Sequence, residues 1–268
     1  MSIPKPVVLC ILDGWGSSDV GTANAPVLAN TPTFDAIMAK GPQARLITHG
    51  PDVGLPSGQM GNSEVGHTNI GAGRVVAMDL GQIDLAIEDG SFYDNEALQA
   101  FIAELKASGG AAHLMGLVSD GGVHGHVTHI LAAIKAIRDA GVPVWLHAMT
   151  DGRDVAPKSA LGYLEQLETE MAEGARIATV TGRYYAMDQD NRWERVSQAY
   201  EAMIKGKGQC TASSDIAAVE ASYGREELDE FVKATVIDGY EGVRDGDGIF
   251  CLNFRADRAR EILRAIGE

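Results

Sequence analysis

The chain has 268 residues, 45% of them hydrophobic and 22% charged, so it can form one large globular domain or two smaller ones. Its formal net charge of −15 excludes a large nucleic-acid-binding surface and argues against docking on anionic membranes, since both need basic surfaces. The longest apolar run near the N-terminus, Val7–Leu12, is too short for a signal h-region or a membrane span. Three widely spaced cysteines, an odd number, indicate a reduced, cytoplasmic protein.

Short β-branched segments alternate with amphipathic segments along the chain. The pattern predicts strands over residues 7–12, 44–48, 112–118, 142–149, 176–181 and 248–253. It predicts helices over residues 33–40, 63–70, 96–107, 127–140, 158–172, 193–205 and 256–266. This alternation is typical of an α/β fold with a mostly parallel sheet covered by helices on both faces. A Gly-rich turn at residues 71–79 marks a boundary between a first unit and a second one.

Five polar clusters come directly after predicted strands. Their sequences are ILDGWG, SDGGVHGH, TDGRD, TGRYYAMDQDNR and NFRADR. Any one of them could be ordinary turn chemistry. Ligands of open α/β sheets bind at the carboxyl ends of the strands, so five such clusters predict a binding site at that edge.

The segment from Gly58 to His67, GQMGNSEVGH, places one serine in a flexible, Gly-rich loop. Asn62 and Ser63 are typical of a helix start, and Glu64 would occupy the first turn. A hydroxyl at such a start faces unpaired backbone N–H groups, which suit a phosphate. The alternative is a Gly-rich turn in which a serine merely caps the helix.

Acidic and basic side chains at the strand ends can serve metal or phosphate chemistry. Asp13 could hold a metal ion or orient a nucleophile, or it could form an Asx turn. Arg153 could clamp a phosphate and Asp154 could exchange a proton with a hydroxyl, although the two could also form a surface ion pair.

Two further groups favour an anion. Arg255 and Arg258 are three residues apart at a predicted helix start, where two positive charges oppose the helix dipole unless an anion is present. Arg183 follows a glycine at a strand end, as an anion-binding arginine could. A metal site at His124 is conceivable, but no cluster of cysteines or carboxylates completes it, and a hydrogen bond to an anionic ligand is preferred.

These residues together indicate an acidic α/β protein that binds a small phosphorylated anion. Arginines clustered in an acidic chain suit such a ligand. A serine at a helix start, together with Asp13, suggests metal-assisted phosphoryl transfer.

The chain resembles the N-terminal half of cofactor-independent (2,3-bisphosphoglycerate-independent) phosphoglycerate mutase, almost from end to end. The matching segments are LDGWG at 12–16, NTPTFD at 30–35, GQMGNSEVGHTNIGAGR at 58–74, SDGGVHGH at 119–126, DGRD at 151–154, GRYYAMDQDNRW at 182–193 and NFRADRARE at 253–261.

The resemblance implies an alkaline-phosphatase-like three-layer α/β/α phosphatase domain, incomplete here, with an inserted α/β phosphotransferase domain. Residues 1–78 would be the first piece of the phosphatase domain, and residues 79–268 most of the insert. The implied enzyme is an isomerase of glycolysis and gluconeogenesis that interconverts 3-phosphoglycerate and 2-phosphoglycerate through a phosphoserine.

The resemblance also implies roles for individual residues. Ser63 would accept the phosphoryl group, Asp13 and Ser63 would bind one of two manganese ions, and Asp154 would be the acid/base for the glycerate hydroxyl. The residues implied to hold the substrate are His124, Arg153, Asp154, Arg183, Arg255 and Arg258.

The chain departs from the family pattern in two places. Gln189 stands where the pattern has arginine, and a neutral amide cannot supply a charge-assisted fork to phosphate, so this substrate contact is in doubt. The chain ends at Glu268, at about half the family's length, and the resemblance places the other metal ligands beyond it. We therefore expect this chain alone to be inactive as a mutase.

Two other functions stay open at the level of sequence. The chain could be a phosphoglycerate-binding module without catalysis, or a metal-dependent phosphatase that hydrolyses its phosphoserine. In every case the expected partner is a small phosphorylated molecule, with no nucleic acid and no membrane, and the full-length protein is expected to be a monomer.

Overall fold

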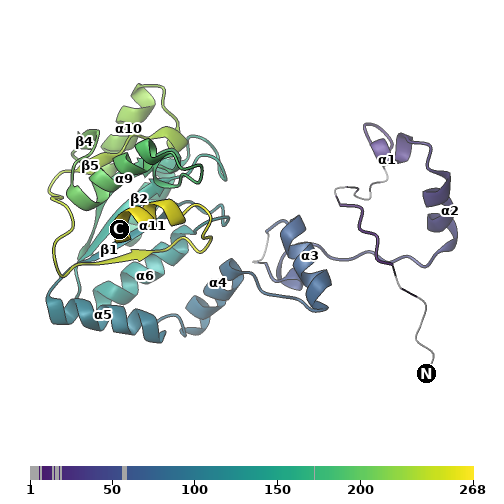
Figure 1. The fold of residues 1–268 in the computed structure, drawn as a ribbon, viewed down its shortest axis with the longest axis horizontal. Helices are drawn as coiled ribbons and strands as arrows, with labels where there is room; N and C mark the ends of the chain where they lie inside the picture. The colour runs from purple at the N-terminus through teal and green to yellow at the C-terminus, as the bar shows by residue number, and fades with distance from the viewer. Residues whose placement is uncertain are drawn as a thin grey trace. The chain divides into compact units, whose positions relative to one another are not determined.

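The computed structural model describes residues 6, 8–13, 15, 18, 20–55, 59–171 and 173–268. The chain divides into two compact units, Met1–Met78 and Asp79–Glu268 (Figure 1). Among the helices in the described ranges, none is long and apolar enough to cross a membrane. Whether the two units are parts of a phosphatase domain and its insert stays a prediction.

The second unit is built on a six-stranded sheet with the order β4-β5-β3-β2-β1-β6. Its strands are β1 (Ala112–Val118), β2 (Val144–Thr150), β3 (Ala175–Gly182), β4 (Cys210–Ala212), β5 (Thr235–Ile237) and β6 (Gly248–Cys251). All neighbours are parallel except the β3–β5 pair. The sequence-based prediction of an α/β fold with a mostly parallel sheet is therefore confirmed.

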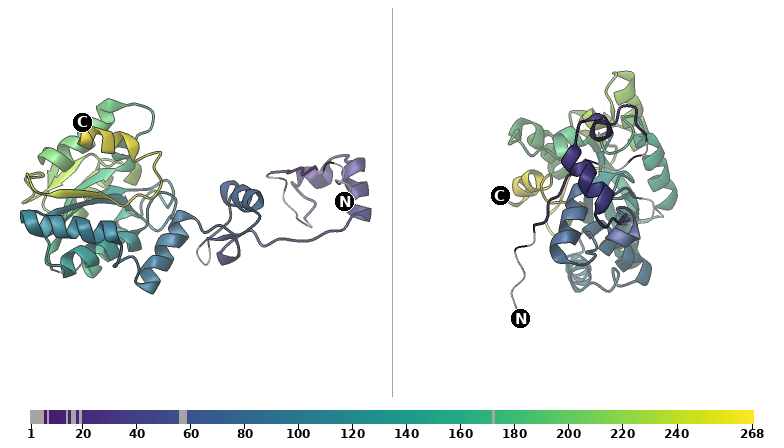
Figure 2. Two further views of the ribbon diagram at one scale, coloured as in Figure 1. Left: turned by 60° about the horizontal axis from the view of Figure 1, so that its bottom comes forward. Right: turned by 90° about the vertical axis from the view of Figure 1, so that its right-hand side faces the viewer.

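Helices cover both faces of this sheet (Figures 1 and 2). The helices of the unit are α4 (Asp79–Asp89), α5 (Glu96–Ser108), α6 (Val127–Asp139), α7 (Ala160–Glu170), α8 (Arg183–Ala186), α9 (Trp193–Lys205), α10 (Asp215–Gly224), the 3-10 turn η2 (Asp229–Phe231) and α11 (Arg260–Gly267). One core forms where α5, α6, α7 and α10 pack on the sheet, and a second where α8, α9 and α11 pack on it.

The alternation of side chains along β1 explains why apolar side chains are packed on both faces of the sheet. Leu114 and Val118 belong to the first core, whereas Met115 and Leu117 belong to the second, because successive side chains of a strand point to opposite faces. All seven residues of β1 are buried, as expected for a parallel strand covered on both sides. The helices follow the predicted ranges closely, and α9 spans the predicted residues 193–205.

The regular elements in the described part of the first unit are helical turns and helices. It contains α1 (Ala25–Leu28), α2 (Pro32–Lys40), the 3-10 turn η1 (Pro51–Val53) and α3 (Ser63–Ala72). The Asn69 side chain joins α3 to its neighbours, since it donates to the Val53 carbonyl at 2.9 Å and accepts from the Val76 N–H at 2.8 Å. Gly54 makes this approach possible, because its φ is +86° and an added Cβ would lie 2.3 Å from the Val76 carbonyl oxygen.

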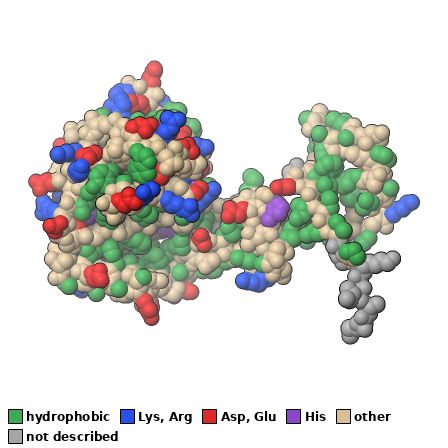
Figure 3. Space-filling view, in the orientation of Figure 1, with side chains coloured by type: hydrophobic (Ala, Val, Ile, Leu, Met, Phe, Trp, Pro, Cys, Tyr) green, Lys and Arg blue, Asp and Glu red, His purple; other side chains and the backbone are tan. Residues whose placement is uncertain are grey.

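The two strands predicted in this unit are not observed. The described residues 8–12 and the residues 44–48 pair with no other strand, and Val7 lies outside the described residues. Apolar side chains of both segments are exposed, including Val8 at 83% and Leu46 at 80%, and such side chains are prominent on this unit's surface (Figure 3). The β-branched pattern was correct for a strand, but a strand also needs a pairing partner, which local sequence does not reveal.

Helix ends and short elements account for the remaining differences. The predicted helix 256–266 begins only at Arg260, because residues 256–259 form a turn in which the Ala256 carbonyl accepts the N–H groups of Ala259 and Arg260. The predicted helix 158–172 runs from Ala160 to Glu170. Several short or weakly amphipathic elements were not predicted; they are α1, α4, α8, α10, β4 and β5.

Candidate functional site

Four of the five polar clusters meet at one edge of the sheet, as predicted. They follow β1, β2, β3 and β6, which are mutually parallel, so their carboxyl ends lie together. Chain order reverses at β1, since β2 and β3 lie on one side of it and β6 on the other. Such a reversal opens a crevice where ligands of α/β proteins bind. The fifth cluster, which contains Asp13, belongs to the first unit and follows no strand in the described residues.

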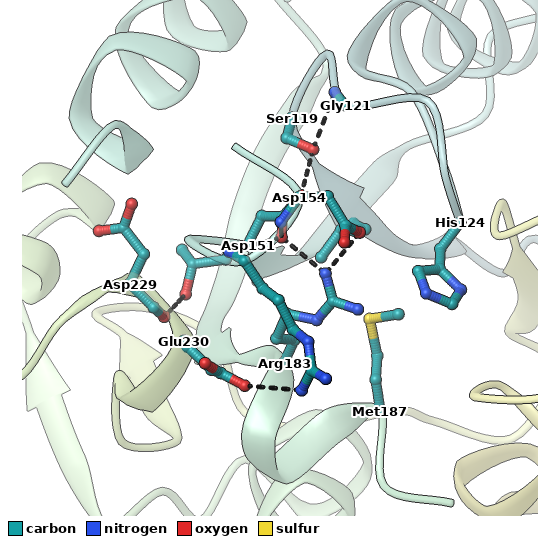
Figure 4. A network of polar contacts seen from close by, with 12 residues as sticks. Ser119, Gly121, His124, Asp151, Asp154, Arg183, Met187, Asp229 and Glu230 are labelled. Carbon is teal, nitrogen blue, oxygen red and sulfur yellow. Dashed lines mark hydrogen bonds and ion pairs between the residues drawn. The ribbon is translucent and has the colours of Figure 1, made fainter. Parts of the chain in front are cut away.

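Arg183 is the buried cation of this edge. It begins α8 directly after β3, and only 3% of its side chain is exposed. Its Nη1 lies 2.7 Å from Asp151 Oδ1 and 2.6 Å from Asp154 Oδ2 (Figure 4). Burial lowers the pKa of Arg183, but hydrogen bonds to Asp154 and Asp151 outweigh it and raise the pKa, so the guanidinium stays charged.

Asp151 joins the ends of three strands. Ser119, just after β1, donates its hydroxyl to Asp151 Oδ2 at 2.6 Å, and Asp151 Oδ1 accepts the backbone N–H groups of Arg153 and Asp154. Burial raises the pKa of Asp151, but these hydrogen bonds and the charge of Arg183 lower the pKa by more than burial raises it. The carboxylate is therefore ionised at neutral pH. Asp151 and Ser119 were present in the predicted clusters but were not singled out.

His124 lies on the other side of Arg183 in Figure 4, near Met187. The residue is 3% exposed, and its Nδ1 makes no hydrogen bond with the described residues, although Asp257 Oδ1 lies 3.6 Å away. Burial and the charge of Arg183 lower the pKa of His124, so the ring is neutral at pH 7. A neutral ring with a free nitrogen can donate one hydrogen bond to an anion.

Arg255 and Arg258 lie beside His124, because the Phe254 N–H donates to the His124 carbonyl at 2.9 Å. Neither arginine is in α11, so the helix-dipole argument made from the sequence is wrong. Asp257 lies 3.1 Å from the Arg255 guanidinium, and Arg258 Nη1 donates to the Met187 carbonyl at 3.2 Å. The arginines thus lie next to this edge of the sheet in the segment before α11 rather than in the helix.

Arg153 and Gln189 are the more exposed members of the predicted set. Arg153 Nη1 lies 3.6 Å from Glu230, and 56% of its side chain is exposed. Gln189 is exposed, and its side chain makes no hydrogen bond with another described residue. Its loop is held by Asp188, whose Oδ2 accepts the N–H groups of Asp190 and Arg192. Both side chains are therefore exposed enough to meet a ligand.

Asp229 supports this edge from a distant part of the chain. Its Oδ2 caps α7 by accepting the N–H groups of Ser159 and Ala160 at 2.8 and 3.0 Å. Its backbone carbonyl accepts the Thr150 hydroxyl at 2.7 Å (Figure 4). These bonds fix both ends of the loop that carries Arg153 and Asp154. No sequence signal pointed to Asp229, because the α7 cap comes from a residue seventy positions away from Ser159.

Ser63 lies at the first position of α3, as the sequence predicted. The Asn62 side chain caps the helix by accepting the Val65 N–H, and the Ser63 hydroxyl donates to Asp13 Oδ2 at 2.8 Å. His67 was not predicted, although its position four residues along the helix could have suggested it. The Nδ1 atom of His67 lies 3.1 Å from Ser63 Oγ and 2.8 Å from the Ser63 carbonyl oxygen. Because the Ser63 hydroxyl donates its hydrogen to Asp13, the imidazole N–H of His67 donates to the Ser63 carbonyl.

A divalent metal ion would find only part of its ligand set here. A carboxylate and a hydroxyl oxygen are ligands that suit manganese or magnesium, which take about six donors. In the part of the chain that the structure describes, no group of three or more His, Cys, Asp or Glu side chains could hold a metal ion. Asp13 and Ser63 therefore fit one side of a metal site and do not complete it.

Comparisons with known proteins identify the family of this chain. The family model described as "BPG-independent PGAM N-terminus" matches residues 83–268. The chain is 82% identical over its whole length to 2,3-bisphosphoglycerate-independent phosphoglycerate mutase of Ruegeria sp. (strain TM1040), and 72% identical to that of Ruegeria pomeroyi. It covers 53% of each of these proteins, so it spans about half the length of the curated relatives that it matches.

A solved structure is similar as well. It is Leishmania mexicana phosphoglycerate mutase, crystallised at low cobalt concentration, with a TM-score of 0.74 and 33% identity. The match covers 89% of this chain and 47% of the Leishmania protein. The chain therefore belongs to the family of 2,3-bisphosphoglycerate-independent phosphoglycerate mutases and corresponds to their N-terminal part.

Proposed function

We propose that this chain carries the phosphoglycerate site and the phosphoryl-accepting serine of a mutase that interconverts 3-phosphoglycerate and 2-phosphoglycerate. The observation that carries the proposal is the convergence of Arg183, His124, Asp154 and Arg258 at one sheet edge of a family member. Buried or half-buried cations beside a neutral histidine suit a small dianion far better than a polymer, and the chain's net charge of −15 agrees with this.

The reaction has two balanced halves. In the first, the bond between phosphorus and O3 of the substrate breaks and a bond between phosphorus and Ser63 Oγ forms, while the proton lost by the serine hydroxyl passes through solvent to the Asp154 carboxylate and from there to O3. In the second, Asp154 takes the proton from O2 of the retained glycerate, the bond between phosphorus and Ser63 Oγ breaks as O2 receives the phosphoryl group, and the proton returns from Asp154 through solvent to Ser63 Oγ. The arginines and His124 would hold the glycerate phosphate in line.

Asp13 would orient the serine hydroxyl, which it already accepts at 2.8 Å. A manganese ion bound by Asp13, Ser63 and further ligands would polarise that hydroxyl and offset negative charge on the phosphoryl group. Because the two donors do not complete a metal site, we propose that the 268-residue chain binds phosphoglycerate but does not turn it over. This also keeps a second candidate open, a binding module without catalysis.

The test combines calorimetry with a coupled mutase assay on the purified chain. We expect saturable binding of 3-phosphoglycerate that is the same with and without manganese, and no turnover above background. Arg183→Gln should remove binding, whereas Arg138→Gln on α6 should not, since Arg138 pairs with Asp139 at the surface. Absence of binding would contradict the proposed site, and turnover that disappears in Ser63→Ala would contradict the proposed inactivity.

We also propose a cellular compartment and the kind of partner for this protein. The described cysteines Cys10, Cys210 and Cys251 are free, which supports a reducing compartment such as the cytoplasm. We further propose a small-molecule partner only, and a monomer for the full-length protein.

A further inference from the structure

Arg183 is shared by two carboxylates that differ in how firmly each is held. Asp151 is 2% exposed, and its two oxygens accept hydrogen bonds from Ser119 and from two backbone N–H groups in addition to Arg183. Asp154 has 15% of its side chain exposed, and its carboxylate bonds to no described residue other than Arg183. Asp151 is thus a fixed acceptor, whereas Asp154 can leave Arg183 without breaking any other bond.

The two carboxylates use only one corner of the guanidinium. Both contacts are made by Nη1, which carries two hydrogens, so Asp151 and Asp154 together occupy it. The Nε and Nη2 groups of Arg183 make no hydrogen bond with the described residues, although the side chain is buried. Nε and Nη2 form the two-donor edge that binds carboxylate or phosphate in a fork.

We propose that Asp151 is a positioning residue for Arg183, holding Nη1 so that the Nε–Nη2 edge stays aimed at an anionic ligand when Asp154 turns to the substrate hydroxyl. Ser119 acts one step further back by fixing the second oxygen of Asp151. The identity of that anion as phosphoglycerate rests on the proposed function, whereas the positioning itself does not.

The alternative is that Asp151 merely neutralises the charge of a buried arginine. The two roles predict opposite changes in the affinity for an anion when the charge of Asp151 is removed. If Asp151 only offset charge, removing its charge would leave Arg183 more attractive to an anion, and affinity would rise. If Asp151 positions the guanidinium, losing its charge weakens the bond that orients the fork, and affinity falls.

The first experiment is NMR of the Arg183 guanidinium in the ligand-free chain, with signals assigned by their loss in Arg183→Lys. We expect resolved, slowly exchanging Nη signals in the wild type and in Asp154→Ala, because Asp151 still holds Nη1. In Asp151→Ala these signals should average and exchange with water. Unchanged signals in Asp151→Ala, or averaging in Asp154→Ala alone, would overturn the proposal.

If Asp151→Ala does not fold, Asp151→Asn tests the same role of Asp151. The amide oxygen can still accept the N–H groups of Arg153 and Asp154, so the loop is preserved while the charge facing Arg183 is lost. We expect faster exchange of the Nη signals in Asp151→Asn and a smaller change of the same kind in Ser119→Ala. Wild-type signals in Asp151→Asn would show a role limited to loop structure.

The second experiment is calorimetry with inorganic phosphate and with 3-phosphoglycerate. We expect Asp151→Asn to weaken the binding of each ligand that the wild type binds by about tenfold, because the hydrogen bond from Arg183 Nη1 to this side chain is then no longer charge-assisted. Equal or tighter binding would overturn the positioning role. If the NMR result holds and neither ligand binds the wild type, the positioning is supported and the proposed function fails instead.

Discussion

The cap that Asp229 places on α7 allows a quantitative prediction of stability. Asp229→Ala removes the acceptor of the Ser159 and Ala160 N–H groups and the partner of the Tyr223 hydroxyl. Loss of a helix cap costs about 1–2 kcal/mol, and a buried hydroxyl left unpaired costs about 1–3 kcal/mol. The expected loss is therefore about 2–5 kcal/mol, which lowers the Tm of a unit of this size by roughly 5–15 °C.

Differential scanning calorimetry of the purified chain measures this shift. Asp229→Asn should lose less than half as much, because its amide oxygen can still cap the helix and its amide nitrogen can donate to Tyr223. Glu220→Ala, on the exposed side of α10, is the matched surface control and should leave the Tm within about 2 °C of the wild type. If Asp229→Ala melted together with Glu220→Ala, the long-range cap would contribute nothing and the reasoning would be refuted.

Three further predictions concern pH, substrate affinity and metal. Burial and the neighbouring Glu168 raise the pKa of Asp215 from 3.8 to about 7. Between these two pH values Asp215 is protonated in the folded state and ionised in the unfolded state. Its stabilising contribution is therefore full below pH 4 and disappears as the pH rises towards about 7, and Asp215→Asn should flatten that part of a stability-versus-pH curve. Gln189→Arg should tighten binding of 3-phosphoglycerate about tenfold, because an exposed arginine at this loop adds a charge-assisted fork. Adding manganese or a chelator should leave the Tm of the chain unchanged, because Asp13 and Ser63 do not complete a metal site.

Each of these has a result that counts against it. A decline of stability between pH 4 and 7 that persists in Asp215→Asn would assign the titration to another group. Equal affinities of wild type and Gln189→Arg by calorimetry would remove this loop from the substrate site. A Tm that rises with manganese and falls back in Asp13→Ala would show that the chain forms a working metal site by itself.

Local periodicity was sufficient to predict the framework of the second unit. The apolar run of β1 and the segment of α9 with a 3.6-residue apolar period are both long enough for the pattern to be clear. Both elements were correctly placed from the sequence. The strands β4 and β5 have three residues each and depend on pairing rather than on pattern, so they were missed. The segments 8–12 and 44–48 show the reverse error, since a strand-like pattern lacks a partner strand among the described residues.

Residues of the candidate site could be predicted from the sequence where their position next to a strand end was the signal. Arg183 and Asp154 stand directly beyond strand ends, and β-strand topology alone brings them together. Asp151 and Asp229 were missed because their importance lies in bonds to residues far along the chain, such as Ser119 and Ser159. The turn at Arg255 and Arg258 was mistaken for a helix start because Asp257 and the Ala256 carbonyl take up the N–H groups there.

The most direct test of the central claim is to locate phosphoglycerate on the chain. Titration of 3-phosphoglycerate into isotope-labelled protein, followed through backbone amide shifts, reports the binding position residue by residue. We predict saturable shifts concentrated in residues 119–126, 151–154, 182–189 and 253–258, the loops after β1, β2, β3 and β6. Saturable shifts elsewhere in the chain, or none at millimolar ligand, would contradict the assignment of this sheet edge as the phosphoglycerate site.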